Sequence, residues 1–278
     1  MGERIVVSGK NRISAYACPP AEPLASCALE GAGALCAAKD VLFAACGGES
    51  VIWRLDKSML VPTGVFAGGP GITQLLRSHD GRRLYALCSE ADSLLMLSAE
   101  TGMPMVLARA GVNPVGMALD ERGETIAVAG GACGEVLLLS ARSLRLMGRL
   151  PVCGMVFSVV TVSGAVYALS LTETMDSVLT AFLPGGIRCE MLLSGMPGAL
   201  AAAPQGIAAA THRALYWISF DAGTVIRVDD VPGRAGRLCI LPEGMMMTDQ
   251  YSDTLCWKGT KDARWRLAAK GVSDALIW

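Results

Sequence analysis

Charged residues are scarce in this sequence of 278 residues. Only 18% of the residues are Asp, Glu, Lys or Arg, whereas 52% are hydrophobic and the mean hydropathy is +0.44. The 24 Lys and Arg balance 25 Asp and Glu, which leaves a formal net charge of −1. A chain without a strong overall field does not attract nucleic acid or an anionic bilayer. We therefore expect no nucleic-acid partner and no membrane partner.

Residue types that usually carry chemistry are also few. The only histidines are His79 and His212, and none of the ten cysteines forms a C-x-x-C pair. The sequence contains no nucleophile elbow, no paired zinc ligands and no glycine-rich phosphate loop ahead of a helix. We therefore expect no catalytic residue, no metal and no cofactor, and the pattern favours a protein that is not an enzyme.

The N-terminal residues 1–7 contain no apolar signal segment. Without a secretory signal, cysteines are reduced by default. We expect a cytoplasmic protein whose ten thiols are all reduced and mostly buried.

Two long uncharged runs, residues 150–172 and 191–211, test the possibility of a membrane span. Both are long enough to cross a bilayer. Each run, however, contains several Pro, Gly, Ser or Thr residues that divide it into short β-rich pieces. The runs therefore predict buried strands separated by turns.

A repeated unit is visible in two segments, Ser78–Cys88 and Leu119–Ala129. Each segment begins with a polar turn that contains Gly and continues into an apolar strand. A further strand follows in each case, at residues 93–98 and 135–140. The pattern predicts units of four short strands joined by tight turns.

Anchor residues in the second strand of each unit recur at a regular spacing. They are Val6, Phe43, Tyr85, Ala127, Tyr167, Ala208 and Met246. The successive steps are 37, 42, 42, 40, 41 and 38 residues, and the step from the last anchor through the chain end to Val6 is again 38. A linear solenoid has no reason to place its ends in register, so this spacing predicts a closed ring.

The two ends of the chain complete one unit between them. Asp274–Trp278 is expected to form a first strand, and Arg4–Ser8, Arg12–Cys18 and Leu24–Leu29 to form the second, third and fourth. Residues 1–278 are therefore predicted to form one all-β domain. That domain is a seven-bladed β-propeller with four-stranded blades, and the ring is closed by the C-terminal strand and three N-terminal strands. Because blades bury both faces, their strands should be continuously apolar.

Residues 78–102 resemble the YVTN-type β-propeller repeat. That pattern has a Ser-Pro-Asp-Gly turn, a Leu-Tyr-Val strand, a second strand and a Thr-Gly turn, and His79 here replaces the usual Pro. The family includes surface-layer proteins and lactonase-like enzymes, so the resemblance implies the fold and leaves a lactonase-like hydrolase as an alternative function. The Gly-His and Trp-Asp signals of WD repeats are absent at the expected places.

The turns between second and third strands, together with the connections between blades, form one face of a propeller, which we call the mouth face. Acidic residues predominate in these turns: Glu49, Glu90, Asp92, Glu173, Asp176, Asp249 and Asp253. Basic residues, together with several acids, gather at the opposite face: Arg77, Arg82, Arg83, Arg122, Arg142, Arg145, Lys258 and Lys261. Loops on a rigid ring are the expected place for recognition.

The densest polar cluster of the mouth face is Asp249–Asp253. Its aromatic and charged side chains are expected to be at least partly exposed and suit a small ligand or a peptide. The candidate ligand-binding residues are His212, Arg213, Asp249, Tyr251 and Arg237. We expect a non-catalytic scaffold that binds a small molecule or a protein segment at the channel mouth, with assembly into a larger complex also open.

Overall fold

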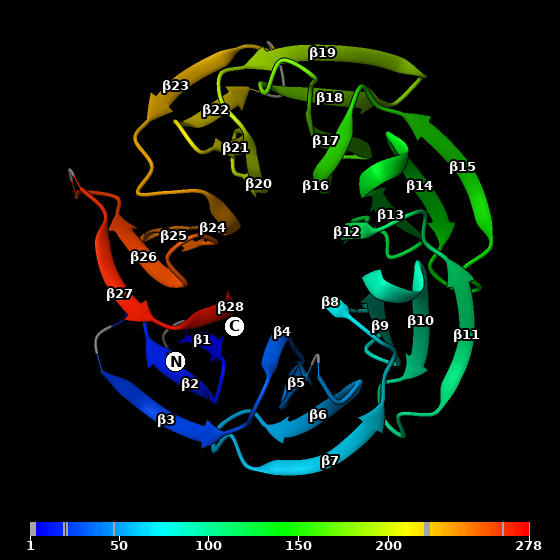
Figure 1. The fold of residues 1–278 in the computed structure, drawn as a ribbon, viewed down its shortest axis with the longest axis vertical. Coiled ribbons are helices and arrows are strands. Elements are labelled where there is room, and N and C mark those ends of the chain that lie inside the picture. The colour runs from blue at the N-terminus through cyan, green and yellow to red at the C-terminus, as the bar shows by residue number, and fades with distance from the viewer. Residues whose placement is uncertain are drawn as a thin grey trace.

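The computed structural model describes residues 4–18, 20, 22–46, 48–219, 223–262 and 264–277. Within them, the strands form seven four-stranded antiparallel sheets. The sheets stand as blades around a central axis (Figure 1). The predicted seven-bladed β-propeller is therefore confirmed.

The blades are numbered here in chain order, each from its innermost to its outermost strand. Blade 1 contains β4 (Ala32–Ala37), β5 (Val41–Cys46), β6 (Val51–Asp56) and β7 (Pro62–Ala67). Blade 2 contains β8 (Ile72–Arg77), β9 (Arg83–Cys88), β10 (Ser93–Ser98) and β11 (Pro104–Arg109). Blade 3 contains β12 (Pro114–Leu119), β13 (Thr125–Gly130), β14 (Glu135–Ser140) and β15 (Leu146–Pro151). Blade 4 contains β16 (Met155–Val162), β17 (Ala165–Leu171), β18 (Ser177–Leu183) and β19 (Ile187–Leu193).

The remaining three blades follow the same order. Blade 5 contains β20 (Pro197–Ala203), β21 (Gly206–Thr211), β22 (Leu215–Ser219) and β23 (Val225–Asp229). Blade 6 contains β24 (Ala235–Leu241), β25 (Gly244–Asp249), β26 (Thr254–Gly259) and β27 (Arg266–Lys270). Blade 7 contains β28 (Val272–Ile277), β1 (Arg4–Gly9), β2 (Arg12–Ala17) and β3 (Pro23–Ala28). Short 3₁₀ turns, η1 (Ser89–Ala91) and η2 (Gly131–Cys133), occur on the mouth face.

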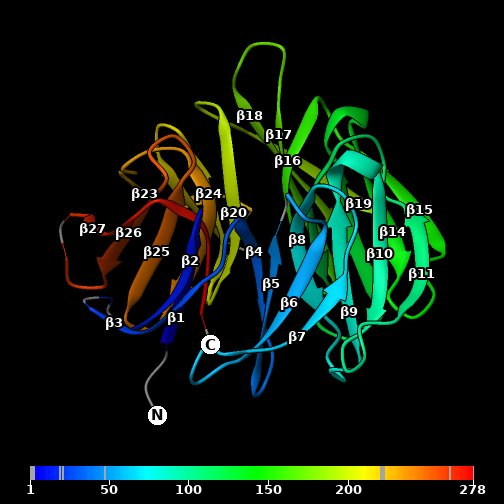
Figure 2. The same ribbon diagram turned by 60° about the horizontal axis from the view of Figure 1, so that its bottom comes forward.

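Blade 7 closes the ring with both chain ends. The antiparallel register of β28 and β1 places Val6 opposite Leu276 and Ile5 opposite Ile277. Figures 1 and 2 both show the C-terminal strand β28, in red, beside the N-terminal strand β1, in blue. The predicted closure is confirmed, although β28 begins earlier than expected, at Val272, and Trp278 lies outside the described residues.

Burial is highest in the second strand of each blade and lowest in the outermost strand. The second strands β5, β9 and β13 are buried at every position but the first, and all seven anchor residues lie in second strands and are buried. The outermost strands β3, β11 and β15 alternate between exposed and half-buried positions instead. Blades diverge with distance from the axis, so the outer strands lose their neighbours. The expectation that blades bury both faces of their strands is therefore wrong for the outermost strands, in which Leu107 of β11 and Leu192 of β19 are 67% and 68% exposed.

The two uncharged runs form strands, as predicted. The first covers β16 and β17, and the second covers β20 and β21. No helix in the described part of the chain is long and apolar enough to cross a membrane.

All ten cysteines are described, and no disulfide joins any two of them. Four of them are buried, three are half-buried, and Cys133, Cys153 and Cys189 are exposed. The expectation that most thiols are buried is therefore wrong. Cys133 and Cys153 lie in a turn or a connection between blades, and Cys189 lies on the outermost strand β19, where the neighbouring blade covers little.

Candidate functional site

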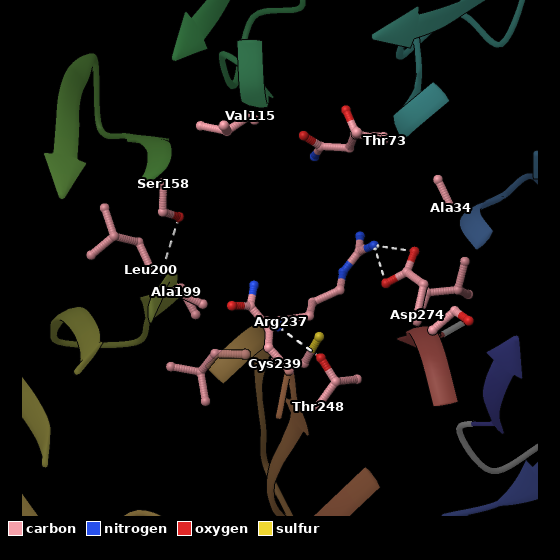
Figure 3. A pocket seen from close by; sticks show the side chains of 18 of the residues that line it. Ala34, Thr73, Val115, Ser158, Ala199, Leu200, Arg237, Cys239, Thr248 and Asp274 are labelled. Carbon is pink, nitrogen blue, oxygen red and sulfur yellow. Dashed lines mark hydrogen bonds and ion pairs between the residues drawn. The ribbon is translucent and has the colours of Figure 1, made fainter. Parts of the chain in front are cut away.

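Each innermost strand is interrupted at the same point by a β-bulge. In β24, Ala235 pairs with Asp249 and Arg237 pairs with Thr248, so that Gly236 is the extra residue. The other six innermost strands have register shifts at the corresponding place. Bulges redirect side chains and bend the strand. The residues around these bulges line a central cavity of about 980 Å³ (Figure 3).

In five blades, one residue of the innermost strand pairs with the second-strand residue two positions beyond the anchor, and in blades 1 and 5 the residue just before the end of the register shift, Ala34 or Ala199, takes the same place. We call these seven residues the channel ring: Ala34, Gln74, Gly116, Ser158, Ala199, Arg237 and Asp274. All seven line the central cavity. Three are small and four are polar, so the ring is polar on only part of its circumference.

Two polar ring residues attach their blade to the next one. The Oε1 atom of Gln74 accepts a hydrogen bond from the Met117 N–H at 2.6 Å, and its Nε2 donates to the Met117 carbonyl at 3.0 Å. The Ser158 Oγ accepts a hydrogen bond from the Leu200 N–H at 3.1 Å (Figure 3). The innermost strands β12 and β20 are edge strands of their sheets, so these bonds satisfy backbone groups that have no partner in the sheet. Gln74 and Ser158 therefore have a structural role.

Arg237 and Asp274 form the one ion pair of the ring among the described residues. Arg237 Nη1 lies 2.9 Å and 2.8 Å from the two carboxylate oxygens (Figure 3). The same carboxylate accepts the Ala275 N–H at 2.8 Å and the Leu35 N–H at 2.9 Å. The Asp274 carboxylate raises the pKa of Arg237 above its usual range, so the guanidinium remains protonated. The Arg237 side chain is 31% exposed and therefore accessible from the cavity.

Two thiols lie near this ion pair. Burial raises the pKa of Cys36 to about 11, against a smaller lowering by Arg237. Burial also raises the pKa of Cys239, again against a lowering by Arg237. Both thiols are therefore neutral near pH 7, and they add no negative charge beside the guanidinium.

A second arginine lies above the ring, in the connection between β23 and β24. The Arg234 guanidinium carbon lies 5.0 Å from the centre of the Phe157 ring and 5.9 Å from that of Tyr251. Its Nε donates a hydrogen bond to the Pro197 carbonyl at 3.0 Å. Cation–π contact with two rings holds this side chain across blades 4 to 6. Phe157 lines the cavity, so this cluster borders the channel mouth.

The structure corrects the expected exposure of Asp249. This carboxylate is only 8% exposed; Oδ1 accepts the N–H groups of Arg234 and Tyr251, both at 3.1 Å, and Oδ2 accepts the Ser252 hydroxyl at 2.5 Å. The sequence showed a polar turn but not that its first residue folds back under the turn. Tyr251 is 68% exposed, as expected.

The five predicted site residues divide into two groups. Arg237 and Asp249 line the central cavity, and Tyr251 borders it through Arg234. His212 and Arg213 lie outside the cavity lining: the His212 Nδ1 accepts the Met196 N–H at 2.7 Å, and the Arg213 Nη1 donates to the Ser194 hydroxyl at 3.0 Å. Both hold the connection that leads into β20. Arg237 itself belongs to strand β24 rather than to a turn.

Sequence reasoning overlooked Asp274, Gln74 and Ser158 as residues of the channel wall. A usable signal was present, because the ring residues precede their anchors by nine to eleven residues around the closed ring. Arg237, for example, stands nine residues before Met246. A comparison of first strands at that spacing would have collected the polar ring residues without a structure.

Several acids of the mouth face have structural partners. Asp92 accepts the Asn113 N–H at 2.7 Å, and Asp176 accepts the Gly195 N–H at 3.0 Å. Each of these bonds ties a turn to the connection that leaves the same blade. The acidic character predicted for this face therefore serves in part to order its loops. Asp253 is exposed and lines the cavity.

On the opposite face, some of the basic residues are paired with acids. Lys258 is only 8% exposed, and its Nζ lies 3.1 Å from Asp230 Oδ1 and 4.0 Å from Asp229 Oδ1. It lies on strand β26, beside a cavity of about 780 Å³ between blades 5 and 6. Arg82 remains exposed, and Arg83 pairs with Asp80 at 3.4 Å.

Solved structures share the arrangement of this chain. A protein of unknown function from Desulfotomaculum acetoxidans DSM 771 aligns with a TM-score of 0.80 and 13% identity, over 100% of this chain and 99% of that one. A candidate 6-phosphogluconolactonase from Bacteroides uniformis ATCC 8492 gives 0.76 and 10%, over 99% of each chain. The WD40 domain of Neurospora crassa Pan2 gives 0.66 and 13%, over 87% and 80%. The likeness shows the fold alone.

No protein-family model and no curated protein matches the sequence. The resemblance to the YVTN-type repeat therefore remains a prediction, whereas the propeller fold is established by the blades themselves. The distinctive chemical feature of this chain is its central channel, in which a protonated guanidinium reaches a cavity with a polar lining.

Proposed function

We propose that this propeller is a binding protein that takes a small molecule, or part of a protein segment, into the mouth of its central channel. The observation that carries the proposal is Arg237, a protonated side chain that is 31% exposed in a cavity of about 980 Å³. A volume of that size accommodates a drug-sized molecule, and a few polar groups that converge on a cavity are typical of binding sites.

The surroundings of Arg237 support binding because they are fixed before a ligand arrives. Asp274 holds the guanidinium by Nη1, and Thr248 Oγ1 accepts the backbone N–H of Arg237 at 2.8 Å. Preorganised groups lose little conformational entropy when they bind a ligand. Above them, the exposed ring of Tyr251 offers contact area at the mouth.

A blocking variant tests the proposal. Thr73 is exposed and lines the cavity, so Thr73→Trp places a large ring in the channel. Gln205→Trp is the matched control, because Gln205 is exposed at the cavity of the opposite face. The probes are a panel of free amino acids, di- and tricarboxylates, sugars, nucleotides and hexapeptides, followed by protein-observed NMR. We expect the compounds that bind the unchanged protein to bind Gln205→Trp as well, and not to bind Thr73→Trp.

Binding that survives Thr73→Trp, or that perturbs signals only on the opposite face, would contradict this assignment. The alternative, a lactonase-like hydrolase, is tested with the same protein by a lactone-hydrolysis assay. Turnover that disappears in His212→Ala would support the hydrolase, since His212 is the one histidine of the mouth face. Its Nδ1 holds the Met196 N–H, which leaves only Nε2 for such a role.

A further inference from the structure

We infer that the ligand of the channel presents a carboxylate group to Arg237. The inference rests on the proposed function and adds the chemical class of the ligand. It follows from counting which hydrogen-bonding groups of the channel ring are already used and which remain.

The acceptors of Asp274 are fully used. Oδ1 accepts from Arg237 and from the Ala275 N–H, and Oδ2 accepts from Arg237 and from the Leu35 N–H. An ionised carboxylate has about four lone-pair sites, two on each oxygen. Asp274 therefore has no site left for a donor of a ligand, and its role is to orient Arg237.

Donors remain on the other polar ring residues. The hydrogen bonds from Arg237 to Asp274 use only Nη1, and Figure 3 shows the other terminal nitrogen directed away from that carboxylate. A guanidinium carries five N–H donors in a planar fork. The Gln74 amide gives one of its two N–H donors to Met117, and Oε1 accepts in return. The Ser158 Oγ accepts from Leu200, and within the described residues its own O–H has no acceptor.

A ligand group that fits this ring must therefore be an acceptor. Among acceptors, a carboxylate matches the planar guanidinium fork, and hydrogen bonds between ionised partners are about twice as strong as neutral ones. A dianionic phosphate suits the site less well. Asp274 already offsets the charge of Arg237, and the carboxylates of Asp249 and Asp253 also line the cavity, so a second negative charge would meet repulsion.

The test compares matched probes in the unchanged protein. Each carboxylate, such as succinate, benzoate or 2-oxoglutarate, is paired with its amide, and methylphosphonate represents the dianion. Tripeptides with a free or an amidated C-terminus distinguish a protein end from a small molecule as the source. The Arg237 guanidinium N–H signals in NMR report contact directly. We expect either the small carboxylates or the tripeptides with a free C-terminus to shift these signals. These compounds should bind roughly tenfold tighter than their amides.

Two variants sharpen the result. Arg237→Lys keeps the charge but removes the fork, and it should weaken carboxylate binding roughly tenfold. Gln74→Glu keeps an oxygen for the Met117 N–H but replaces the amide nitrogen, with its free donor and the donor given to the Met117 carbonyl, by a negatively charged oxygen. It should weaken carboxylates more than amides. Arg82→Lys, on the opposite face, is the control and should change neither. Melting curves identify any variant that fails to fold.

The outcomes separate the two proposals. Suppose that compounds bind and that Thr73→Trp abolishes their binding, so that the channel site stands. If amides then bind as tightly as carboxylates, both to the unchanged protein and to Arg237→Lys, the carboxylate inference is wrong. If no carboxylate or peptide shifts the Arg237 signals at concentrations up to roughly 10 mM, the inference is also wrong. If carboxylates bind equally well to Thr73→Trp, the channel site itself is wrong.

Discussion

The contact between blades 2 and 3 and the contact between blades 6 and 7 use the same ring position differently. Gln74 engages Met117 with both ends of its amide and thereby joins its blade to the next. Arg237 engages Asp274 through one nitrogen, and the rest of its guanidinium reaches the cavity. Equivalent positions in a repeat therefore place side chains alike, but the number of hydrogen-bonding groups on each side chain decides whether any remain for a ligand.

The largest expected effect comes from removing the contact between blades 6 and 7 entirely. Deletion of residues 274–278 takes away Asp274 and the buried Leu276 and leaves the edge of β1 exposed. We expect a loss of at least about 3 kcal/mol in the free energy of unfolding, together with aggregation. Chemical denaturation measures it. Leu192→Ala, on an exposed outer position, is the control and should stay within about 0.5 kcal/mol. An unchanged melting temperature after the deletion would disprove the closure.

A smaller change separates the ionic contact from the amide contact. Asp274→Asn keeps the shape of the side chain but leaves the Arg237 charge without a counter-ion, and we expect a loss of about 2 kcal/mol. Gln74→Met leaves the N–H and carbonyl of Met117 facing the channel, at a cost of about 1 kcal/mol. Urea unfolding of both variants measures which loss of stability is larger. Equal losses would show that charge adds nothing to the contact between blades 6 and 7.

The Asp249 turn tests which mouth residues order the loops and which are available to a ligand. Asp249→Ala removes three hydrogen bonds from a buried carboxylate and should cost about 1 to 2 kcal/mol. Tyr251→Ala removes an exposed ring and should change stability by less than about 0.5 kcal/mol while weakening binding at the mouth. Thermal unfolding and the ligand titration are measured on both variants. A destabilised Tyr251→Ala with unchanged binding would reverse these roles.

The last expected effect appears only at high pH and concerns the buried thiols. Burial raises the pKa of both Cys36 and Cys46 to about 11 from an ordinary value of 9.0. The unfolded chain loses these protons at lower pH than the folded protein, so stability present below pH 9.0 should decline as pH rises toward 11. Each thiol should contribute on the order of 1 kcal/mol at pH 10. Denaturation of the Cys36→Ala/Cys46→Ala variant and of the unchanged protein at several pH values measures how steeply the free energy of unfolding falls with pH. Parallel pH profiles of the two proteins would contradict this prediction.

Much of the fold could be predicted because the repeat is a property of spacing. The anchors from Val6 to Met246 and the complementary chain ends identified the blades and the closure without any contact being known. The candidate site could be predicted only in part. Tyr251 was expected to be exposed and is exposed, but Asp249 is buried because its turn folds over it, and turn geometry was not visible in the order of the residues.

The sequence by itself determined the number of blades, the strand that closes the ring and the apolar character of the inner strands, because these follow from periodicity and composition along the chain. Only the tertiary structure decided which polar side chains meet. Arg237 and Asp274 stand 37 residues apart on neighbouring innermost strands, and the bulges set both at one level of the channel. Such pairing depends on the register between blades, which arises from packing around the axis rather than from any local pattern.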